Sequence, residues 1–250
     1  QDALTEKLGD RVTFDVQNAS GESVNCSTII NGFVSDQVDL ILANATGALQ
    51  AAVAGTTEIP ILGTAVTDYA TALDIDGWTG TVGGNVSGTS DCAPLDQQAA
   101  MILELVPDAK TVGMLYCSAE PNSEYQVNAV TEALKELNPD LEIKNYTFAD
   151  SNDISSVATS ATECDVVYIP TDNTAANNTE AINNVMDPAG VPVITGEAGI
   201  CQGCGIATLS ISYYDLGYTT GEMAYEILEE GADISTMEVR YAPNVTKQYI

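Results

Sequence analysis

Short apolar runs alternate with longer amphipathic segments along nearly all of the 250 residues. The apolar runs predict strands, and the segments of about 10–15 residues between them predict helices. Strands joined by helices form right-handed βαβ units and therefore parallel sheets. This alternation places the chain in the α/β class. The predicted strands cover residues 12–16, 38–42, 59–62, 111–116, 141–148, 165–169, 191–194, 206–211 and 237–241.

One stretch interrupts the alternation. Residues 77–90 are rich in Gly, Thr and Ser and contain five glycines. Such a composition is typical of a crossing or hinge segment and not of an element interior. The same alternation then restarts with a predicted helix over residues 94–106, and a later helix is predicted over residues 174–186. Two runs of this kind predict two α/β lobes with parallel sheets and a cleft between them.

The beginning of the chain departs from this pattern. Residues 1–9 read as the second half of a helix that ends at Gly9. Because a βαβ domain normally has a strand before its first helix, we expect that a first strand and the loop after it are missing from this chain. The alternative is a lobe that starts with a helix.

The charge balance excludes several classes of function. Seven Lys and Arg residues stand against 36 Asp and Glu residues, the formal net charge is −29, and there is no histidine. Nucleic acids and anionic lipids are bound through clusters of Lys and Arg, so nucleic-acid binding is excluded as a main activity. The lack of histidine excludes Ser-His-Asp and Cys-His catalysis and His-ligated metals. We expect no metal and no cofactor.

Six cysteines leave the redox compartment open. Only Cys201 and Cys204 are close in sequence, and a zinc ribbon would need a second such pair. A small loop disulfide, free thiols, and redox or metal chemistry remain as alternatives for these two. The other four lie in apolar runs and are expected to pack as small hydrophobic side chains.

The residues that follow the predicted strands suggest a binding site. In open parallel sheets, ligands bind beyond the carboxyl ends of the strands. In the first run these positions carry hydroxyls and helix N-termini, which suit a carboxylate. In the second run they carry the single carboxylates Glu120, Asp172 and Glu197, any of which suits an ammonium group. The two sets together predict a zwitterionic ligand, although Thr46, Ser123, Asp172 and Thr174 can equally be read as ordinary N-caps.

Catalysis is not expected. A two-lobed amino-acid racemase would need a cysteine at a strand end in each lobe, but Ala43 stands before Asn44, and Cys117 has no partner. Neither a dinucleotide fingerprint between strand and helix nor a phosphate-binding GxxxxGK[ST] motif occurs. Paired glycosidase carboxylates do not suit parallel two-lobed sheets. An amino-acid-processing enzyme on this fold remains the alternative from a different class.

Several segments resemble a known family over essentially the whole chain. They are similar to bacterial ABC-transporter substrate-binding proteins of the group that includes tryptophan/tyrosine-binding lipoproteins. The Cys-Ser-Ala-Glu-Pro-Asn-Ser and Pro-Thr-Asp-Asn-Thr segments are the most specific. The segments that carry the resemblance are residues 43–50, 59–64, 96–101, 116–123, 170–174 and 209–217.

The resemblance implies a type I periplasmic-binding fold, in which two Rossmann-like lobes are joined by three crossovers. It assigns residues 1–88 and 206–233 to one lobe, and residues 89–205 and 234–250 to the other. It also implies capture of an aromatic or hydrophobic amino acid by lobe closure and its delivery to the membrane permease of an ABC transporter. The expected protein is an extracellular monomer held by a lipid anchor outside this chain. The alternative is the same fold with another small ligand, such as a nucleoside, a sugar or a signalling molecule.

The resemblance also implies the ligand-binding residues. Thr46 and Thr64 would hold the carboxylate, and Asp172 or Glu197 the ammonium group. Tyr69 and Tyr116 are candidates for stacking against an aromatic ligand, or else core residues. The full expected set is Thr46, Thr64, Thr67 and Asp68 from the first lobe, and Ser118, Glu120, Asn122, Ser123, Asp172, Asn173 and Glu197 from the second.

Overall fold

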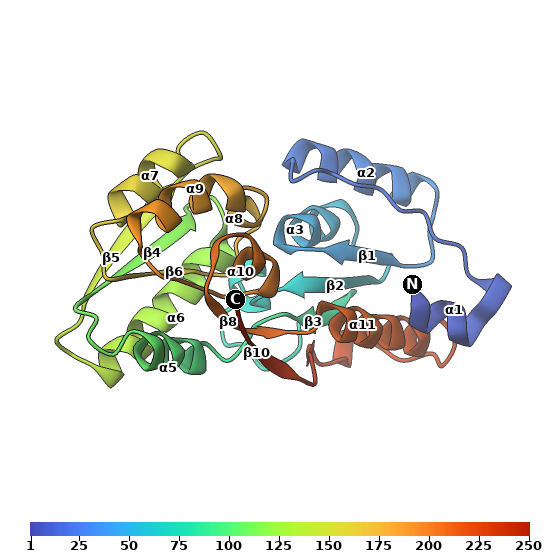
Figure 1. Ribbon diagram of the computed structural model, residues 1–250. Coiled ribbons are helices and arrows are strands. Elements are labelled where there is room, and N and C mark those ends of the chain that lie inside the picture. Colours follow the sequence, from blue (N-terminus) through green and yellow to red (C-terminus); the bar gives the residue numbers. More distant parts are fainter. The chain divides into compact units, whose positions relative to one another are not determined.

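The computed structural model describes residues 1–250 and divides into two compact units (Figure 1). The first unit comprises residues 1–92 and 212–244, and the second comprises residues 93–211 and 245–250. Each unit has its own sheet, and parallel pairs dominate both sheets. The predicted α/β class with two parallel sheets is confirmed.

The first unit is a four-stranded sheet of order β1-β2-β3-β9 with all neighbours parallel. Helices α2 and α3 pack on one face, and α1 and α11 pack on the other (Figure 1). The elements are α1 (Asp2–Leu8), a 3₁₀ turn (Gly9–Arg11), α2 (Ser23–Ser35), β1 (Ile41–Asn44), α3 (Thr46–Gly55), β2 (Ile61–Val66), α4 (Tyr69–Leu73), β3 (Val86–Ser90), α11 (Tyr213–Leu228), a second 3₁₀ turn (Ile234–Thr236) and β9 (Arg240–Tyr241).

The second unit is a six-stranded sheet of order β10-β8-β7-β6-β4-β5, in which only β10 is antiparallel. Helices α5 and α6 cover one face, and α7 to α10 cover the other. The elements are α5 (Leu95–Leu105), β4 (Thr111–Cys117), α6 (Pro121–Leu137), β5 (Glu142–Phe148), α7 (Ile154–Ala161), β6 (Val166–Ile169), α8 (Asn173–Ala176), α9 (Thr179–Ala189), β7 (Val193–Thr195), α10 (Ala198–Cys204), β8 (Ala207–Ile211) and β10 (Val245–Tyr249).

Helices on both faces explain the composition of the central strands. All four residues of β6 are buried, and β4 is buried from Val112 to its end. Such strands read as continuous apolar runs, because neither face meets water. Their carboxyl ends, where the runs stop, are therefore the positions at which polar residues gather.

The strand predicted over residues 12–16 is wrong. No backbone hydrogen bond joins these residues to a neighbouring strand, and Val16 is 71% exposed. An isolated strand has no ladder to satisfy its backbone groups and no face on which to pack, so alternation alone does not make this segment part of a sheet.

The interpretation of residues 77–90 as a hinge is wrong for their last five residues. These form β3, the buried strand between β2 and β9. The strand lacks an apolar pattern because its residues are small. A Cβ on Gly88 would lie 2.2 Å from the carbonyl oxygen of Gly63 and 2.2 Å from the hydroxyl of Tyr69. Close approach of β2, β3 and that ring therefore requires glycine.

The units also differ from the predicted lobe boundaries. Residues 206–211 were assigned to the first lobe, but β8 pairs with β7 in the second sheet. Residues 234–250 were assigned to the second lobe, but β9 pairs with β3 in the first sheet, and only residues 245–250 lie in the second unit. The chain returns from the second unit to the first after β8 and not before it, because β8 pairs with β7 in the second sheet.

Smaller differences concern element ends. The helix predicted over residues 174–186 is two helices, α8 and α9. Strand β1 begins and ends later than the predicted residues 38–42, and β2 continues to Val66 through a register shift. All six cysteines are free thiols, and both Cys201 and Cys204 belong to α10 and not to a loop. No helix has the length and apolar character needed to cross a membrane.

Candidate functional site

The carboxyl edge of the first sheet has an unusual backbone. Ala45, between β1 and α3, has φ 78° and ψ 159°, and Ala65, within β2, has φ 52°. The amide of Ala45 donates to the carbonyl oxygen of Thr64 at 2.9 Å, so the two segments are joined. Positive φ values are costly for alanine, and such conformations gather at functional sites.

Two threonines at this edge have hydroxyls that make no hydrogen bond to another protein group. Thr46, the first residue of α3, is 6% exposed, and Thr67, directly after β2, is 4% exposed. The first backbone amides of α3 are donors without helical partners. This edge therefore combines spare hydrogen-bonding capacity with a helix N-terminus, an environment suited to an anion.

Thr64 belongs to a cluster of three hydroxyls. Its Oγ1 lies 3.2 Å from Oγ1 of Thr89 on β3 and 3.0 Å from Oγ1 of Thr220 on α11. Thr89 and Thr220 are 2.7 Å apart. Of the three, only Thr64 is partly exposed. It is thus the member of the cluster that can meet a ligand.

Asp68 and Tyr69 follow β2. Asp68 caps α4, with Oδ1 accepting from the amide of Thr71 at 2.7 Å, and its Oδ2 accepts no hydrogen bond. Tyr69 is 1% exposed, and its hydroxyl donates to the carbonyl oxygen of Thr89 at 3.2 Å. Tyr69 is therefore a core residue; Tyr116, at 7% exposed, is buried in the second unit's core.

In the second unit, Glu120 connects the end of β4 to the start of α8. Its Oε2 accepts from the amide and Nδ2 of Asn173, both at 2.9 Å, and its Oε1 accepts from the amide and hydroxyl of Thr174 at 2.8 and 2.7 Å. Nδ2 of Asn122 lies 3.4 Å from Oε2. The carboxylate is thus already surrounded by donors of its own unit.

Asp172 is the most buried carboxylate of the expected site, at 1% exposed. It accepts from the amide of Cys117 and the hydroxyl of Ser123 with Oδ2, at 2.7 and 2.8 Å, and from the amide of Ala175 with Oδ1, at 2.7 Å. Burial and the neighbouring charge of Glu120 raise the pKa of Asp172 to about 6. Asp172 holds β4, α6 and α8 together, which leaves little access for a ligand.

Two further polar residues complete this network. Gln126 lies one helical turn after Asn122 on α6. Nε2 of Gln126 donates to the carbonyl oxygens of Asn122 and Thr171, and its Oε1 accepts from the amide of Thr171. Nδ2 of Asn122 donates to the same Thr171 carbonyl at 3.0 Å. Sequence reasoning missed Gln126, although its spacing of four from Asn122 places both on one helix face.

The remaining expected residues lie outside this network. Ser118 is exposed, and its hydroxyl donates to the carbonyl oxygen of Phe148 at 3.3 Å. Glu197 caps α10 by accepting from the amides of Gly199 and Ile200, and it is half-buried. The structure thus joins Glu120, Asn122, Ser123, Asp172 and Asn173 in one network, and it shows no hydrogen bond between them and Glu197.

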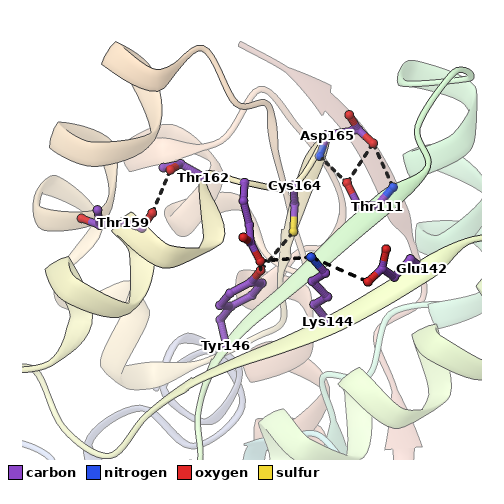
Figure 2. A network of polar contacts seen from close by, with 9 residues as sticks. Thr111, Glu142, Lys144, Tyr146, Thr159, Thr162, Cys164 and Asp165 are labelled. Atoms are coloured by element: carbon purple, nitrogen blue, oxygen red, sulfur yellow. Dashed lines mark hydrogen bonds and ion pairs between the residues drawn. The ribbon is translucent and has the colours of Figure 1, made fainter.

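A second polar cluster lies at the amino edge of the same sheet (Figure 2). Tyr146 bonds to Glu163 at 2.7 Å and lies 3.4 Å from the Cys164 sulfur, while Lys144 bonds to Glu163 at 3.0 Å. Gly113 leaves room for this packing, since a Cβ there would lie 3.2 Å from both the sulfur and the Tyr146 ring. We assign this cluster to packing of β5 against the α7–β6 connection.

In both α/β units the carboxyl ends of the strands carry hydroxyls and carboxylates, at the positions where open α/β sheets bind small molecules. The chain belongs to the ABC transporter substrate binding protein family, whose model matches residues 1–247. This membership confirms the resemblance found in the sequence and the type I architecture that it implied. The family is one of substrate-binding proteins.

Individual relatives agree with this assignment. A tyrosine-binding protein of Clostridioides difficile (strain R20291) is 36% identical over 224 residues, which are 89% of this chain and 64% of the relative's length. An ABC domain from Streptococcus pneumonia, solved in complex with L-Trp, is 29% identical with a TM-score of 0.90, covering 98% of this chain and 84% of that one. A ligand-free, open substrate-binding protein with adhesive properties from Clostridium difficile is 34% identical with a TM-score of 0.73, covering 98% and 83%.

Proposed function

We propose that this chain captures an aromatic or similarly hydrophobic L-amino acid outside the cell and delivers it to the permease of an ABC importer. The observation that carries this proposal is the carboxyl edge of the first sheet. Thr46 and Thr67, both mostly buried residues, have hydroxyls there that make no hydrogen bond to protein, and Thr46 begins a ten-residue helix whose N-terminus suits an α-carboxylate. The tyrosine- and L-Trp-binding relatives support an aromatic side chain.

The carboxylates that the sequence offered for the ammonium group are not equivalent. Glu120 and Asp172 already accept several hydrogen bonds from their own unit. Asp68 has one oxygen without a partner, and Glu197 accepts only the two amides of its cap. We therefore assign the ammonium group to Asp68 or Glu197 and give Asp172 a role in holding the site together.

The other residues of the expected set keep their proposed roles as ligand contacts. Thr46, Thr64 and Thr67 donate to the carboxylate, and Ser118, Asn122 and Asn173 supply polar contacts from the second unit. The two units close on the ligand, which leaves chemically unchanged. The chain acts as a monomer anchored by lipid, without nucleic acid or cofactor.

Thermal unfolding with a ligand panel tests this function. A ligand that binds only the folded chain raises the midpoint as its concentration exceeds the dissociation constant. We expect L-tryptophan, L-tyrosine or L-phenylalanine to raise it, and a nucleoside or a sugar to leave it unchanged. Asp68→Asn or Glu197→Gln should reduce the shift. If only a nucleoside or a sugar raises the midpoint, the ligand is of that class and the proposal of an amino acid is wrong.

Mass spectrometry of the recovered ligand tests the absence of catalysis. We expect the amino acid to return unchanged after prolonged incubation with excess ligand. Steady conversion that disappears in Cys117→Ser would show an amino-acid-processing enzyme instead. Cys117 is a poor candidate for that chemistry, because burial raises the pKa of its thiol.

A further inference from the structure

We infer that Thr89 and Thr220 are positioning residues that turn the hydroxyl proton of Thr64 outward, toward an anionic oxygen of the ligand. This inference rests on the proposed function, in which Thr64 contacts the ligand carboxylate. Neither Thr89 nor Thr220 is expected to touch the ligand itself. They come from β3 and α11, two elements that pack around β2 in the first unit (Figure 1).

Burial separates the inner members of the cluster from the outer one. Thr89 is fully buried and Thr220 is 3% exposed, whereas Thr64 is partly exposed at the carboxyl edge. Buried hydroxyls must find protein partners, because no bulk water reaches them. The hydrogen bonds of Thr89 and Thr220 are therefore confined to the cluster and to the Leu216 carbonyl oxygen, 2.9 Å from the Thr220 hydroxyl.

The number of protons limits how the cluster can be arranged. Each threonine hydroxyl has one proton and two lone pairs. Thr64 is the acceptor in both of its contacts, from Thr89 at 3.2 Å and from Thr220 at 3.0 Å, whereas the 2.7 Å contact between Thr89 and Thr220 can run in either direction. Thr89 then donates to Thr220 or Thr64, and Thr220 donates to Thr64 or to the Leu216 carbonyl oxygen, so these two protons serve the inner contacts and the proton of Thr64 serves none of them. It can then point out of the protein.

This arrangement makes Thr64 a directed donor. Successive hydroxyls that donate in one direction polarise one another, so the last proton binds an anion more strongly. An anionic oxygen accepts that proton more strongly than the neutral carbonyl oxygen of an amide does, and the NH₂ group of an amide cannot accept it. The cluster should therefore favour a carboxylate over a carboxamide at the position that Thr64 contacts.

The test compares an L-amino acid with its carboxamide. Affinities of L-tryptophan and L-tryptophanamide are measured for the wild-type chain, T220V and T220S. Valine keeps the shape of threonine and removes the hydroxyl, while serine keeps the hydroxyl. We expect the preference for the acid over the amide to fall roughly tenfold in T220V and to be retained in T220S. T89V should behave like T220V.

Thr219→Val is the matched control. Thr219 lies next to Thr220 on α11, and its hydroxyl donates to the carbonyl oxygen of Asp215, outside the cluster. The acid-over-amide preference should be unchanged in T219V. Thermal unfolding without ligand shows that each variant is folded before its affinities are compared.

The outcomes separate this inference from the proposed function. Binding of L-tryptophan with an unchanged acid-over-amide preference in T220V overturns the inference and leaves the function standing. Failure of the wild-type chain to bind any aromatic amino acid overturns the function and the inference with it. If the amide binds too weakly to measure, T64V, T220V and their double variant are compared on the acid alone. Full additivity of their effects then overturns the inference.

Discussion

Asp172 and Asp165 lie in the same unit, and each accepts three hydrogen bonds. The fold nevertheless shifts the pKa values of these two carboxyls in opposite directions. Burial and the charge of Glu120 raise the pKa of Asp172 to about 6. Asp165 is exposed, and donors from Lys110 and Thr111 lower its pKa. The number of donors is equal, so burial and the neighbouring charge of Glu120 decide the sign for Asp172.

This difference predicts opposite pH dependences. When the pKa of a carboxyl is raised in the folded state, the free energy of unfolding of the protein increases as the pH falls from that pKa toward the ordinary pKa of the group. In urea unfolding, the free energy of unfolding of Asp172→Asn relative to that of the wild type should therefore be higher at pH 7 than at pH 5. Asp165→Asn removes a stabilisation that the ionised carboxylate provides. Its free energy of unfolding relative to that of the wild type should therefore be lower at pH 7 than at pH 3. Equal pH dependence of the two variants would contradict the assigned roles.

The sequence predicted which residues stand at the strand ends, but not which of them are already engaged. A carboxylate after a strand looks the same whether it caps a neighbouring helix, as Asp172 does, or keeps a free oxygen, as Asp68 does. The difference depends on where α6 and α8 are packed. Thr89 and Thr220 were missed because they are 131 residues apart and meet only in the folded unit.

Helix α11 shows how the packing of an element depends on single positions. Gly217 and Gly221 are one turn apart. A Cβ on Gly217 would meet nothing within 4 Å, whereas a Cβ on Gly221 would lie 2.9 Å from Cβ of Ala3 on α1. Helix α1 packs on α11 through this close approach.

The two glycines therefore predict opposite effects of the same substitution. Gly217→Ala should stabilise the chain by about 0.5–1 kcal/mol, because alanine loses less backbone entropy in a helix. Gly221→Ala should destabilise it by about 1–3 kcal/mol, because α1 must move away. Chemical denaturation of both variants measures the difference. Stabilisation by Gly221→Ala would show that α1 does not pack as described.

At the scale of elements, the sequence predicted most helices and most buried strands, because the helices have a strong periodicity and the buried strands are continuous apolar runs. It failed where the pattern and the surroundings disagree. Residues 12–16 alternate like a strand but have no neighbour, while β3 lacks apolar alternation because it fits between β2, β9 and the ring of Tyr69. A strand depends on its partners as much as on its own residues.

The whole molecule is dominated by negative charge. Seven cationic residues face 36 acidic ones, and the five ion pairs are largely exposed, including Arg11–Glu229 and Lys247–Glu104. Exposed pairs contribute little to stability, whereas a net charge of −29 repels itself in the compact state.

Screening should therefore stabilise the chain. Raising sodium chloride from 20 to 200 mM, roughly a threefold shortening of the Debye length, should raise the thermal midpoint by about 2–4 °C. Choline chloride should give the same rise, since screening does not depend on the cation. A midpoint that falls with salt would mean that the ion pairs outweigh the repulsion.

The two-unit α/β architecture was predictable because it follows from the alternation of the whole chain. The unit boundaries were not predictable, because they depend on which sheet each strand pairs with. Strand β8 pairs with β7 in the second unit, and β9 pairs with β3 in the first. Family membership then set the class of function. The central proposal is that the ligand is an aromatic or similarly hydrophobic L-amino acid.

Isothermal titration of the chain with L-tryptophan and L-tyrosine tests that claim most directly. We predict saturable binding of one molecule per chain by at least one of them, with weaker binding to Thr64→Val, which loses a donor to the carboxylate. The corresponding amines, which lack the carboxylate, should bind more weakly than the amino acids. Tight one-to-one binding of a sugar or nucleoside, with no heat from any aromatic amino acid, would contradict the account.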